Sequence, residues 1–428
     1  MKTNRAILMA LLLTPAVVTT AGFSVPRPAV SGPDSCRASA PARINAAYAG
    51  WLSLLRRRDT LPRKEFLDNA DALVRSTFDV RAMGAHIFEK KWEELGAHHQ
   101  KEFAEALVRS LRARLLANLG SAEHAPRLVP ADEPPEPRDQ EMEIAFSLVR
   151  EDGSDALRVR VATGADGACR VVDIRDGDRA LLSDTEKRVR RLVDEYSFAY
   201  MVAELGDYNF VDLEDFESTP EGQLPVGWTW RDSDANKNKP YRVRSENGNR
   251  YLQATDEGES VILGREVRWN LDEYPYVSFR VRVWKIPEGG DERFSDKVDS
   301  AAGIYFTVRK KFFGKIPESI KYVWSSTLPV GAAVRRDGIG KPWQVVFGTD
   351  RKGLGEWHTY VFDLRQAYSD TFGGDVPSKP VGIGVLSDAN SLKEQAYADY
   401  DDIRALRSAP SDVTSGVKEI LPAEGHIK

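Results

Sequence analysis

The spacing of apolar residues changes about halfway along the chain. Up to about residue 205, most apolar side chains recur at every third or fourth position, which is the period of an amphipathic helix. From Phe210 onward they alternate with polar side chains in short runs separated by Gly, Pro, Asn and Asp, which is typical of β-strands. Two periods in succession within 428 residues predict a two-domain α+β protein whose C-terminal domain consists of β-strands.

A long amphipathic helix is predicted in the first half, from about His99 to Leu119. Phe103, Leu107 and Leu111 lie four residues apart on one face, and charged residues fill the opposite face. Gly120 stands where this helix should end, because glycine adopts the left-handed conformation freely. We therefore expect the helix to cover an apolar surface of its own domain.

Shorter helices are predicted on both sides of it. They run over Ile44–Arg58 and Pro62–Arg75, with Pro62 at a tolerated first-turn position. Ser183 and Glu186 form a capping-box pattern for a last helix that ends near residue 205.

Two strands are predicted between these helices, at Glu141–Val149 and Ala156–Thr163. Apolar and polar residues alternate along both, so each strand has one buried face. A helical layer on such a sheet forms either a filled core or the wall of a ligand cavity, and the spacing alone leaves both interpretations open.

The segment 78–92 reads Phe-Asp-Val-Arg-Ala-Met-Gly-Ala-His-Ile-Phe-Glu-Lys-Lys-Trp. Its Phe, Asp, Met, Ile, Phe and Trp, followed by Phe103, Leu107 and Leu111, make the chain resemble the MlaC/toluene-tolerance (Ttg2D-like) family. The resemblance extends through the two strands to Val171–Gly177 and covers roughly the first half of the chain. It implies helices on a curved antiparallel sheet of the NTF2/cystatin-like kind. It also implies that the proline-rich residues 126–137 hold a first strand and a loop, not a domain linker.

Members of that family are periplasmic phospholipid carriers that serve an ABC lipid transporter. The resemblance therefore implies a phospholipid ligand, a membrane ABC transporter complex and an outer-membrane lipoprotein as partners. Burial of each CH₂ group is worth about 0.8 kcal/mol, so an acyl chain crosses an aqueous compartment only inside an apolar cavity. The cavity lining that follows from the family pattern is Phe78, Met83, Ile87, Trp92, Phe103, Leu107, Leu111, Ile144, Phe146, Val159, Val161, Leu192 and Tyr196.

The first 21 residues have the features of a secretory signal peptide. A short basic head is followed by the apolar run Ala6–Val18 and by small residues that end at Ala21, the expected cleavage site. We therefore expect an exported, periplasmic protein of a Gram-negative cell. The expected segments are a signal peptide (1–21), a flexible lead-in (22–42), the MlaC-like domain (43–206), the β-sandwich (209–408) and a C-terminal tail (409–428). The formal net charge of −5 argues against nucleic-acid binding.

The sequence contains two cysteines, Cys36 and Cys169. In an oxidising compartment they could form a disulfide. A lipid anchor at Cys36 is the alternative, but Pro33-Asp-Ser lacks the apolar residues of a lipobox. Neither cysteine belongs to a C-x-x-C pair, so metal and redox-enzyme interpretations are weak.

About ten strands are predicted in the second half. The run Tyr241–Gln253 predicts a hairpin with a type I′ turn at Asn247-Gly248. Further strands are expected around residues 277–283, 302–308, 320–325, 344–347, 358–364, 381–386 and 396–406. This number of short strands predicts an antiparallel β-sandwich of the jelly-roll type.

The second half resembles a bacterial β-sandwich family of unknown function. The resemblance lies in Lys321-Tyr-Val-Trp324, residues 326–331, Arg335-Arg-Asp337 and Asp399–Ile403. More loosely, the half resembles carbohydrate-binding jelly rolls, through residues 215–217, 225–228 and 401–402. Those modules bind a structural Ca²⁺ between their first and last strands, which implies Glu217 and Asp402 as ligands here. The alternative is that these carboxylates are edge charges that discourage aggregation.

Tryptophans and basic residues are frequent in this half. Tryptophans on a sandwich face stack on sugars, but tryptophan is more often buried. Basic residues could face a phosphate-bearing glycolipid, or they could line a solvated sheet face. The basic set comprises Arg309, Lys310, Lys311, Lys315, Lys321, Arg335 and Arg336.

No catalytic motif stands out in the sequence. Asp399, Asp401 and Asp402 could supply a glycosidase carboxylate pair, but three acids on one short strand give no opposed pair. We therefore expect a protein that is not an enzyme: a phospholipid carrier, auxiliary to an Mla-type ABC transport system of the outer membrane, fused to a β-sandwich binding module. The alternative is an envelope glycan-binding or glycan-active protein whose helical domain docks a partner.

Overall fold

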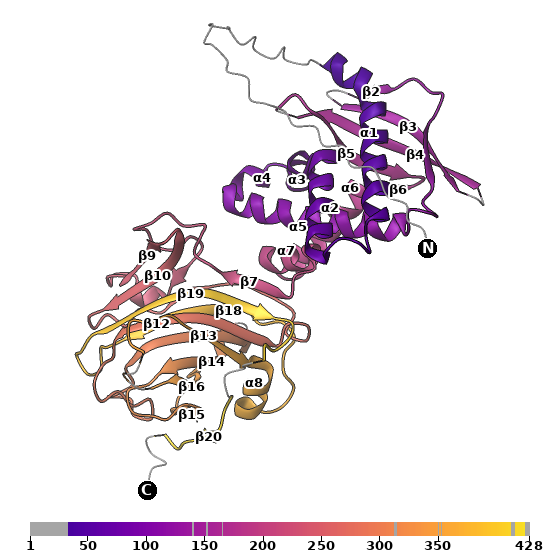
Figure 1. The fold of residues 1–428 in the computed structure, drawn as a ribbon. Coiled ribbons are helices and arrows are strands. Elements are labelled where there is room, and N and C mark those ends of the chain that lie inside the picture. Colours follow the sequence, from indigo (N-terminus) through magenta and orange to yellow (C-terminus); the bar gives the residue numbers. More distant parts are fainter. Residues whose placement is uncertain are drawn as a thin grey trace, which may run out of the picture.

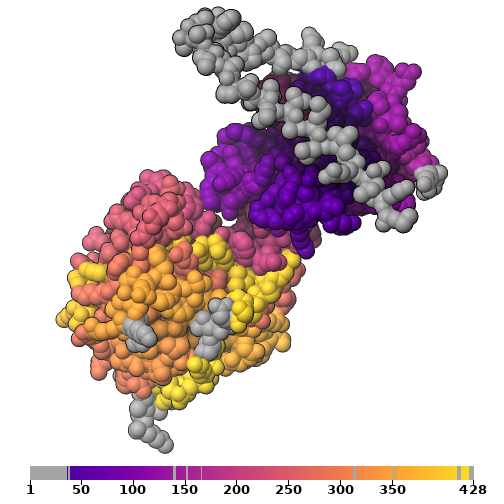
Figure 2. Space-filling model, in the orientation of Figure 1, coloured from indigo at the N-terminus to yellow at the C-terminus, as the bar shows by residue number. Residues whose placement is uncertain are grey.

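The computed structural model describes residues 33–138, 141–150, 153–164, 166–311, 315–349, 351, 353–411 and 416–423. The expected signal peptide (1–21) lies outside these residues. Figure 1 shows a lobe of helices on a sheet, coloured indigo to magenta, followed by a lobe of two packed sheets. The space-filling view shows the two lobes meeting over a restricted area (Figure 2). No helix in the described ranges is long and apolar enough to cross a membrane.

Within the residues that the structure describes, the first lobe has seven helices. They are α1 (Pro33–Arg56), α2 (Arg63–Thr77), α3 (Val80–Phe88), α4 (Lys91–Glu94), α5 (Gly96–Leu119), α6 (Leu181–Glu195) and α7 (Phe198–Gly206). Because α1 begins at Pro33, the expectation of a flexible lead-in over residues 22–42 is wrong from that residue on. Proline is tolerated in the first turn of a helix, and alanine is frequent in the stretch that follows.

The capping box predicted at Ser183 is also wrong. Helix α6 begins two residues earlier, at Leu181, and no side chain of its own caps it. Instead, the Leu182 N–H donates to Asp173 Oδ1 of the neighbouring strand at 2.9 Å. The predicted single helix is interrupted after Glu195, and Ser197 caps α7 by accepting a hydrogen bond from the N–H of Tyr200.

The sheet of the first lobe is antiparallel throughout its described pairings, in the order β1-β3-β4-β5-β6 with β2 beside β3. The proline-rich residues 126–137 contribute β1 and part of β2, so they are not a linker. The strands are β1 (Arg127–Pro130), β2 (Glu136–Arg138), β3 (Glu141–Arg150), β4 (Gly153–Thr163), β5 (Cys169–Asp176) and β6 (Arg179–Ala180).

The second lobe is a sandwich of two sheets. The six-stranded sheet contains β7 (Phe210–Glu214), β9 (Tyr241–Glu246), β10 (Asn249–Asp256), β12 (Tyr276–Lys285), β17 (His358–Asp363) and β19 (Ala396–Leu406). The eight-stranded sheet runs in the order β20 (Glu419–Ile420), β15 (Ala332–Val334), β16 (Trp343–Gly348), β14 (Ile316–Trp324), β13 (Ser300–Lys311), β18 (Gly382–Asp388), β11 (Leu263–Arg265) and β8 (Thr229–Trp230).

The α+β fold class and the predicted hairpin are confirmed. Strands β9 and β10 pair antiparallel, and Asn247 and Gly248 both have positive φ, as a type I′ turn requires. Two pairings depart from an antiparallel sandwich, because β14–β16 and β15–β20 are parallel. Helix α8 (Leu364–Phe372) was not predicted, although Asp363 caps it by accepting the Gln366 N–H.

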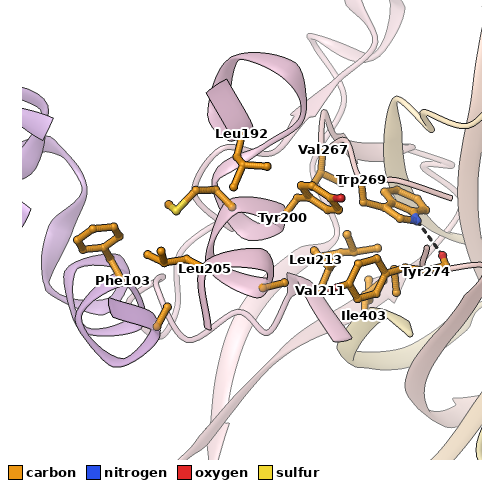
Figure 3. Close-up of a cluster of buried hydrophobic side chains, with 14 of the residues drawn as sticks. Phe103, Leu192, Tyr200, Leu205, Val211, Leu213, Val267, Trp269, Tyr274 and Ile403 are labelled. Carbon is orange, nitrogen blue, oxygen red and sulfur yellow. Dashed lines mark hydrogen bonds between the residues drawn. The ribbon is translucent and has the colours of Figure 1, made fainter. Parts of the chain in front are cut away.

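One continuous cluster of buried side chains passes from the first lobe into the second. Figure 3 follows it from Phe103 through Leu205 and Tyr200 of α7 to Trp269 and Ile403 of the sandwich. Helix α7 therefore belongs to both cores, and it fixes the orientation of the sandwich relative to the helical layer.

Candidate functional site

The eight-stranded sheet presents a hollowed face on the side away from the six-stranded sheet. Along β13, Ile304 and Phe306 are buried in the core between the sheets, whereas Tyr305 and Thr307 line a cleft of about 850 Å³. This alternation follows from the two-residue period of a strand. A volume of this size lies within the range of small-molecule sites.

The strand register places one row of residues across the floor of this cleft. Tyr305 lies opposite Lys321 of β14 on one side and opposite Gly384 of β18 on the other, and Lys321 lies opposite Gln344 of β16. The row continues through Gly264 of β11 to Thr229 of β8. All six residues line the cleft. The two glycines carry no side chain, which deepens that half of the floor.

Lys321 lies in the row between Tyr305 and Gln344, and it is only 2 % exposed. Its Nζ donates a hydrogen bond to Ser300 Oγ at 3.1 Å. The side chain passes over Gly303, where a Cβ would lie 2.4 Å from Lys321 Cε. Burial lowers the pKa of this ammonium group, and the charges of Asp388 and Glu292 partly oppose the shift.

Three buried carboxyl groups surround the lysine. Asp299 accepts the N–H groups of Ser391 (3.1 Å) and Leu392 (2.7 Å). Glu292 Oε2 accepts the Ser325 hydroxyl at 2.6 Å, and burial raises the pKa of this carboxyl to about 7.

Burial also raises the pKa of Asp388, which lines the cleft. Within the described residues, Asp388 Oδ1 and Glu292 Oε1 are buried without a hydrogen-bond partner. An unpaired buried polar oxygen is costly. Asp388 belongs to the cleft lining, so its Oδ1 is available as an acceptor there, whereas Glu292 is completely buried and does not line the cleft.

The rim of the cleft carries aromatic and basic groups. Trp230 is 37 % exposed, and Lys239 Nζ lies 4.6 Å from its ring centroid. Of the predicted basic set, Lys310, Lys321 and Arg336 line the cleft. By contrast, Arg309 and Lys311 form ion pairs with Glu318, so the set is divided between two environments.

The two predicted calcium ligands are bound by other groups. Glu217 Oε1 accepts the Arg250 N–H at 2.7 Å, and Asp402 pairs with Arg404 (2.7 Å) and Arg280 (3.2 Å). In the part of the chain that the structure describes, no group of three or more His, Cys, Asp and Glu could hold a metal ion. The calcium site stays a prediction, without a ligand set in this structure.

The residues predicted to line a lipid cavity lie in the core of the first lobe. All of them except Tyr196 are buried, and several pack on one another, as in the edge-to-face pair Trp92–Phe103 at 6.0 Å. Val161 alone of the predicted set lines a groove of about 320 Å³ between α1, α2 and the sheet. The other walls of this groove include Ile44, Ala47 and Leu73. The prediction missed the groove because its walls come from α1 and α2, which the family pattern did not mark.

Cys36 and Cys169 form a disulfide with a Cα–Cα distance of 5.3 Å. It joins the first turns of α1 to the start of β5, and Cys169 also borders the groove. The bond therefore holds α1 against the sheet at one end of the groove.

Comparisons with known proteins give one family match. Residues 227–404 match DUF3047, a family of proteins of unknown function. The residues on which the resemblance to a β-sandwich family of unknown function rests, from Lys321 to Ile403, lie inside this range. A search of curated proteins finds no match.

Several solved structures resemble parts of the chain. A phospholipid-binding protein from Ralstonia solanacearum covers 39 % of this chain and 94 % of its own, at 15 % identity and a TM-score of 0.33. A family 30 carbohydrate-binding module from Clostridium thermocellum covers 46 % of this chain and 91 % of its own, at 11 % identity and a TM-score of 0.23. The xyloglucanase domain of NopAA from Sinorhizobium fredii covers 44 % of this chain and 98 % of its own, at 12 % identity and a TM-score of 0.24. At these scores, the function has to be argued from the residues of this chain.

Proposed function

We propose that this protein binds ligands and is not an enzyme, and that its sandwich binds a saccharide in the cleft of the eight-stranded sheet. The observation that carries the proposal is the row from Thr229 to Gln344, which lies across six strands on the floor of the 850 Å³ cleft. Such a floor suits an extended ligand that crosses the strands.

The chemistry of the lining favours a sugar over an apolar ligand. Lys321 and the amide of Gln344 are donors, while Asp388 offers an acceptor oxygen without a partner among the described residues. Sugar hydroxyls are both donors and acceptors, so they can satisfy each of these groups. The exposed ring of Trp230 at the rim provides a flat surface for a pyranose ring.

A glycan array followed by calorimetry tests this proposal. We expect Lys321→Met to weaken binding of the selected glycan at least about tenfold, because a charge-assisted hydrogen bond is worth roughly 1.5–3 kcal/mol. Lys311→Met is the matched control, since Lys311 lies on the adjacent strand, pairs with Glu318 and does not line the cleft. Equal binding by both variants would place the glycan elsewhere.

A second proposal concerns the first lobe, which we infer carries a phospholipid in the periplasm as part of an Mla-type transport system. Its support is the groove of about 320 Å³ between α1, α2 and the sheet, together with the sequence resemblance of segment 78–92. Ile44, Leu73 and Val161 give the groove apolar walls that could hold part of an acyl chain.

Native mass spectrometry of protein purified from a Gram-negative periplasm tests the lipid proposal. Sequencing of the mature N-terminus tests cleavage near Ala21 in the same sample. We expect a co-purified phospholipid in the unmodified protein and its loss in Ala47→Trp, whose indole would fill the groove. Ala49→Trp on the exposed side of α1 should keep the lipid. A ligand-free protein, or lipid retained by Ala47→Trp, would exclude this groove as the lipid site.

A further inference from the structure

A second pocket, of about 640 Å³, lies where the two lobes meet, and five arginines line it. Four come from the helices α5 and α6, and Arg407 follows the last long strand of the sandwich. The lining arginines are Arg109, Arg112, Arg114, Arg188 and Arg407, accompanied by the carboxyl groups of Glu204, Asp207 and Glu273.

Two of these arginines are neutralised by carboxylates. Arg112 binds both oxygens of Asp71 at 2.8 Å. Arg407 binds Glu204 at 2.8 Å and Asp207 at 3.3 Å. The charges of these two guanidinium groups are therefore balanced within the protein.

Arg109 and Arg188 are held in place without being neutralised. Arg109 Nε donates to the carbonyl oxygen of Gly206 at 2.8 Å, and its guanidinium lies 4.1 Å from the ring centroid of Tyr208. Arg188 donates to the carbonyl oxygen of Glu204 at 2.6 Å. A carbonyl group fixes the direction of a guanidinium but does not cancel its charge.

Arg114 has neither kind of partner. In the described ranges of the chain its half-buried guanidinium makes no hydrogen bond or ion pair. Burial lowers the pKa of this group, the neighbouring charge of Arg188 lowers it further, and the charge of Asp184 partly opposes the shift. Two like charges that approach each other in a partly buried pocket are unfavourable unless an anion lies between them.

We propose that this pocket binds a phosphate group, either free or as the phosphate of a lipid headgroup. Arg109, Arg114 and Arg188 supply fixed positive charges around one space, and a guanidinium fork matches the oxygens of a phosphate. A phosphate dianion balances more of this charge than a carboxylate does, and it offers more acceptor oxygens. The proposal does not depend on a saccharide in the cleft or a lipid in the groove.

The test is thermal unfolding of the full mature protein with increasing inorganic phosphate, compared with potassium chloride at equal ionic strength. We expect a saturable rise in the melting temperature with phosphate only. Arg114→Gln and Arg188→Gln should each raise the apparent dissociation constant at least about tenfold. Arg190→Gln is the matched control, because Arg190 lies on the same helix, 60 % exposed and paired with Glu186.

The outcomes separate the alternatives. An equal response to chloride, or an unchanged response in both pocket variants, would overturn the proposal. Arg114→Lys keeps the charge but lacks the fork, so it should bind phosphate with intermediate affinity, and it serves as the test if Arg114→Gln does not fold. Sedimentation with phosphatidylglycerol vesicles that is lost in Arg188→Gln would identify a lipid headgroup. Soluble phosphate binding without vesicle binding would identify a free phosphate.

Discussion

At the scale of single residues, the cleft is built around a cluster of buried charged groups. Lys321 and Asp388 are almost fully buried beside Glu292, which is completely buried. Burying charges is costly, and breaking such a cluster leaves an uncompensated charge. Clusters of this kind with shifted pKa values are frequent at functional sites. This cost is the physical reason to consider the face a binding site and not merely a solvated sheet surface.

Glu292 provides a pH test of the cluster. Burial raises the pKa of its carboxyl from 4.5 to about 7 in the folded protein, so the folded state binds the proton more tightly than the unfolded state. Stability from this group is therefore present below pH 4.5 and falls as the pH rises to about 7, by roughly 3 kcal/mol. Glu292→Gln should remove this fall, as measured by urea unfolding at pH 5 and pH 8.

The control for this prediction is Glu288→Gln in the same loop, where the carboxylate is exposed and pairs with Arg351. It should keep the pH dependence of the unmodified protein. If Glu292→Gln shows the same pH dependence as the control, Glu292 is not protonated in the folded state near neutral pH.

Gly303 tests how tightly Lys321 is packed. A Cβ at this position would meet Lys321 Cε at 2.4 Å and the Leu386 carbonyl oxygen at 3.1 Å. We expect Gly303→Ala to lower the free energy of unfolding by about 2 kcal/mol, because overpacked interiors typically lose 1–3 kcal/mol. Gly264→Ala in the same sheet has 3.4 Å to its nearest neighbour and should cost much less. Equal urea midpoints for the two variants would contradict this packing.

At the scale of elements, the sequence predicts strands and long helices well because their periods extend over many residues. The boundaries of β3, β4 and α5 lie within a few residues of the predicted ones. The errors occur where a tertiary contact replaces a local signal. Ser183 looked like a helix cap, but Asp173 of a neighbouring strand satisfies the start of α6.

The cleft could not be predicted from the sequence, because it too depends on tertiary contacts. Alternation along β13 and β14 places Tyr305 and Lys321 on one face, yet only the register between strands sets them beside Gln344 and Gly384. No short-range pattern in the sequence encodes that register. Lys321 was singled out by the family resemblance, whereas Glu292 and Asp388 were not, because both come from segments without a recognisable motif.

The disulfide gives a prediction for the first lobe. Cys36 and Cys169 are 133 residues apart, and closing a loop of that length is worth up to about 5 kcal/mol in the chain-entropy model. We expect dithiothreitol to lower the guanidinium midpoint of the oxidised protein. The double variant Cys36→Ser/Cys169→Ser should start from the lower midpoint and show no further response to the reductant. A response in the double variant would mean that the reductant acts on something other than this bond.

At the scale of the whole molecule, the shared core makes the two lobes depend on each other. Tyr200 of α7 contacts Tyr274 of the sandwich, with ring centroids 5.9 Å apart (Figure 3). The Tyr274 hydroxyl also donates to Glu204 at 2.8 Å. The predicted boundary between residues 206 and 209 falls inside this core. Local patterns could not show this, because α7 looks like the last helix of the first lobe when its sequence is viewed alone.

A group of titratable residues lies beside this shared core, between α5 and β7. Burial and the charge of Asp215 raise the pKa of Asp212 to about 8, and burial raises the pKa of Glu102 to about 7. A hydrogen bond to Asp215 raises the pKa of His98, which lies 3.4 Å from that carboxylate. All three groups bind a proton more tightly in the folded protein. Their contribution to stability is therefore greatest in mild acid and falls as the pH rises toward 9.

The variant Asp212→Asn should show how much of this pH-dependent stability comes from Asp212. The rise of the Asp212 pKa from 3.8 to about 8 corresponds to several kcal/mol of pH-dependent stability. Because the side chain is 23 % exposed and solvent screens it, we expect a contribution of roughly 3 kcal/mol. The melting temperature of the unmodified protein should fall between pH 6 and pH 9, and the variant should lose much of this fall. Asp207→Asn, at an 88 % exposed carboxylate nearby, should behave like the unmodified protein. If Asp212→Asn keeps the full pH dependence, Asp212 is not protonated in the folded protein near neutral pH.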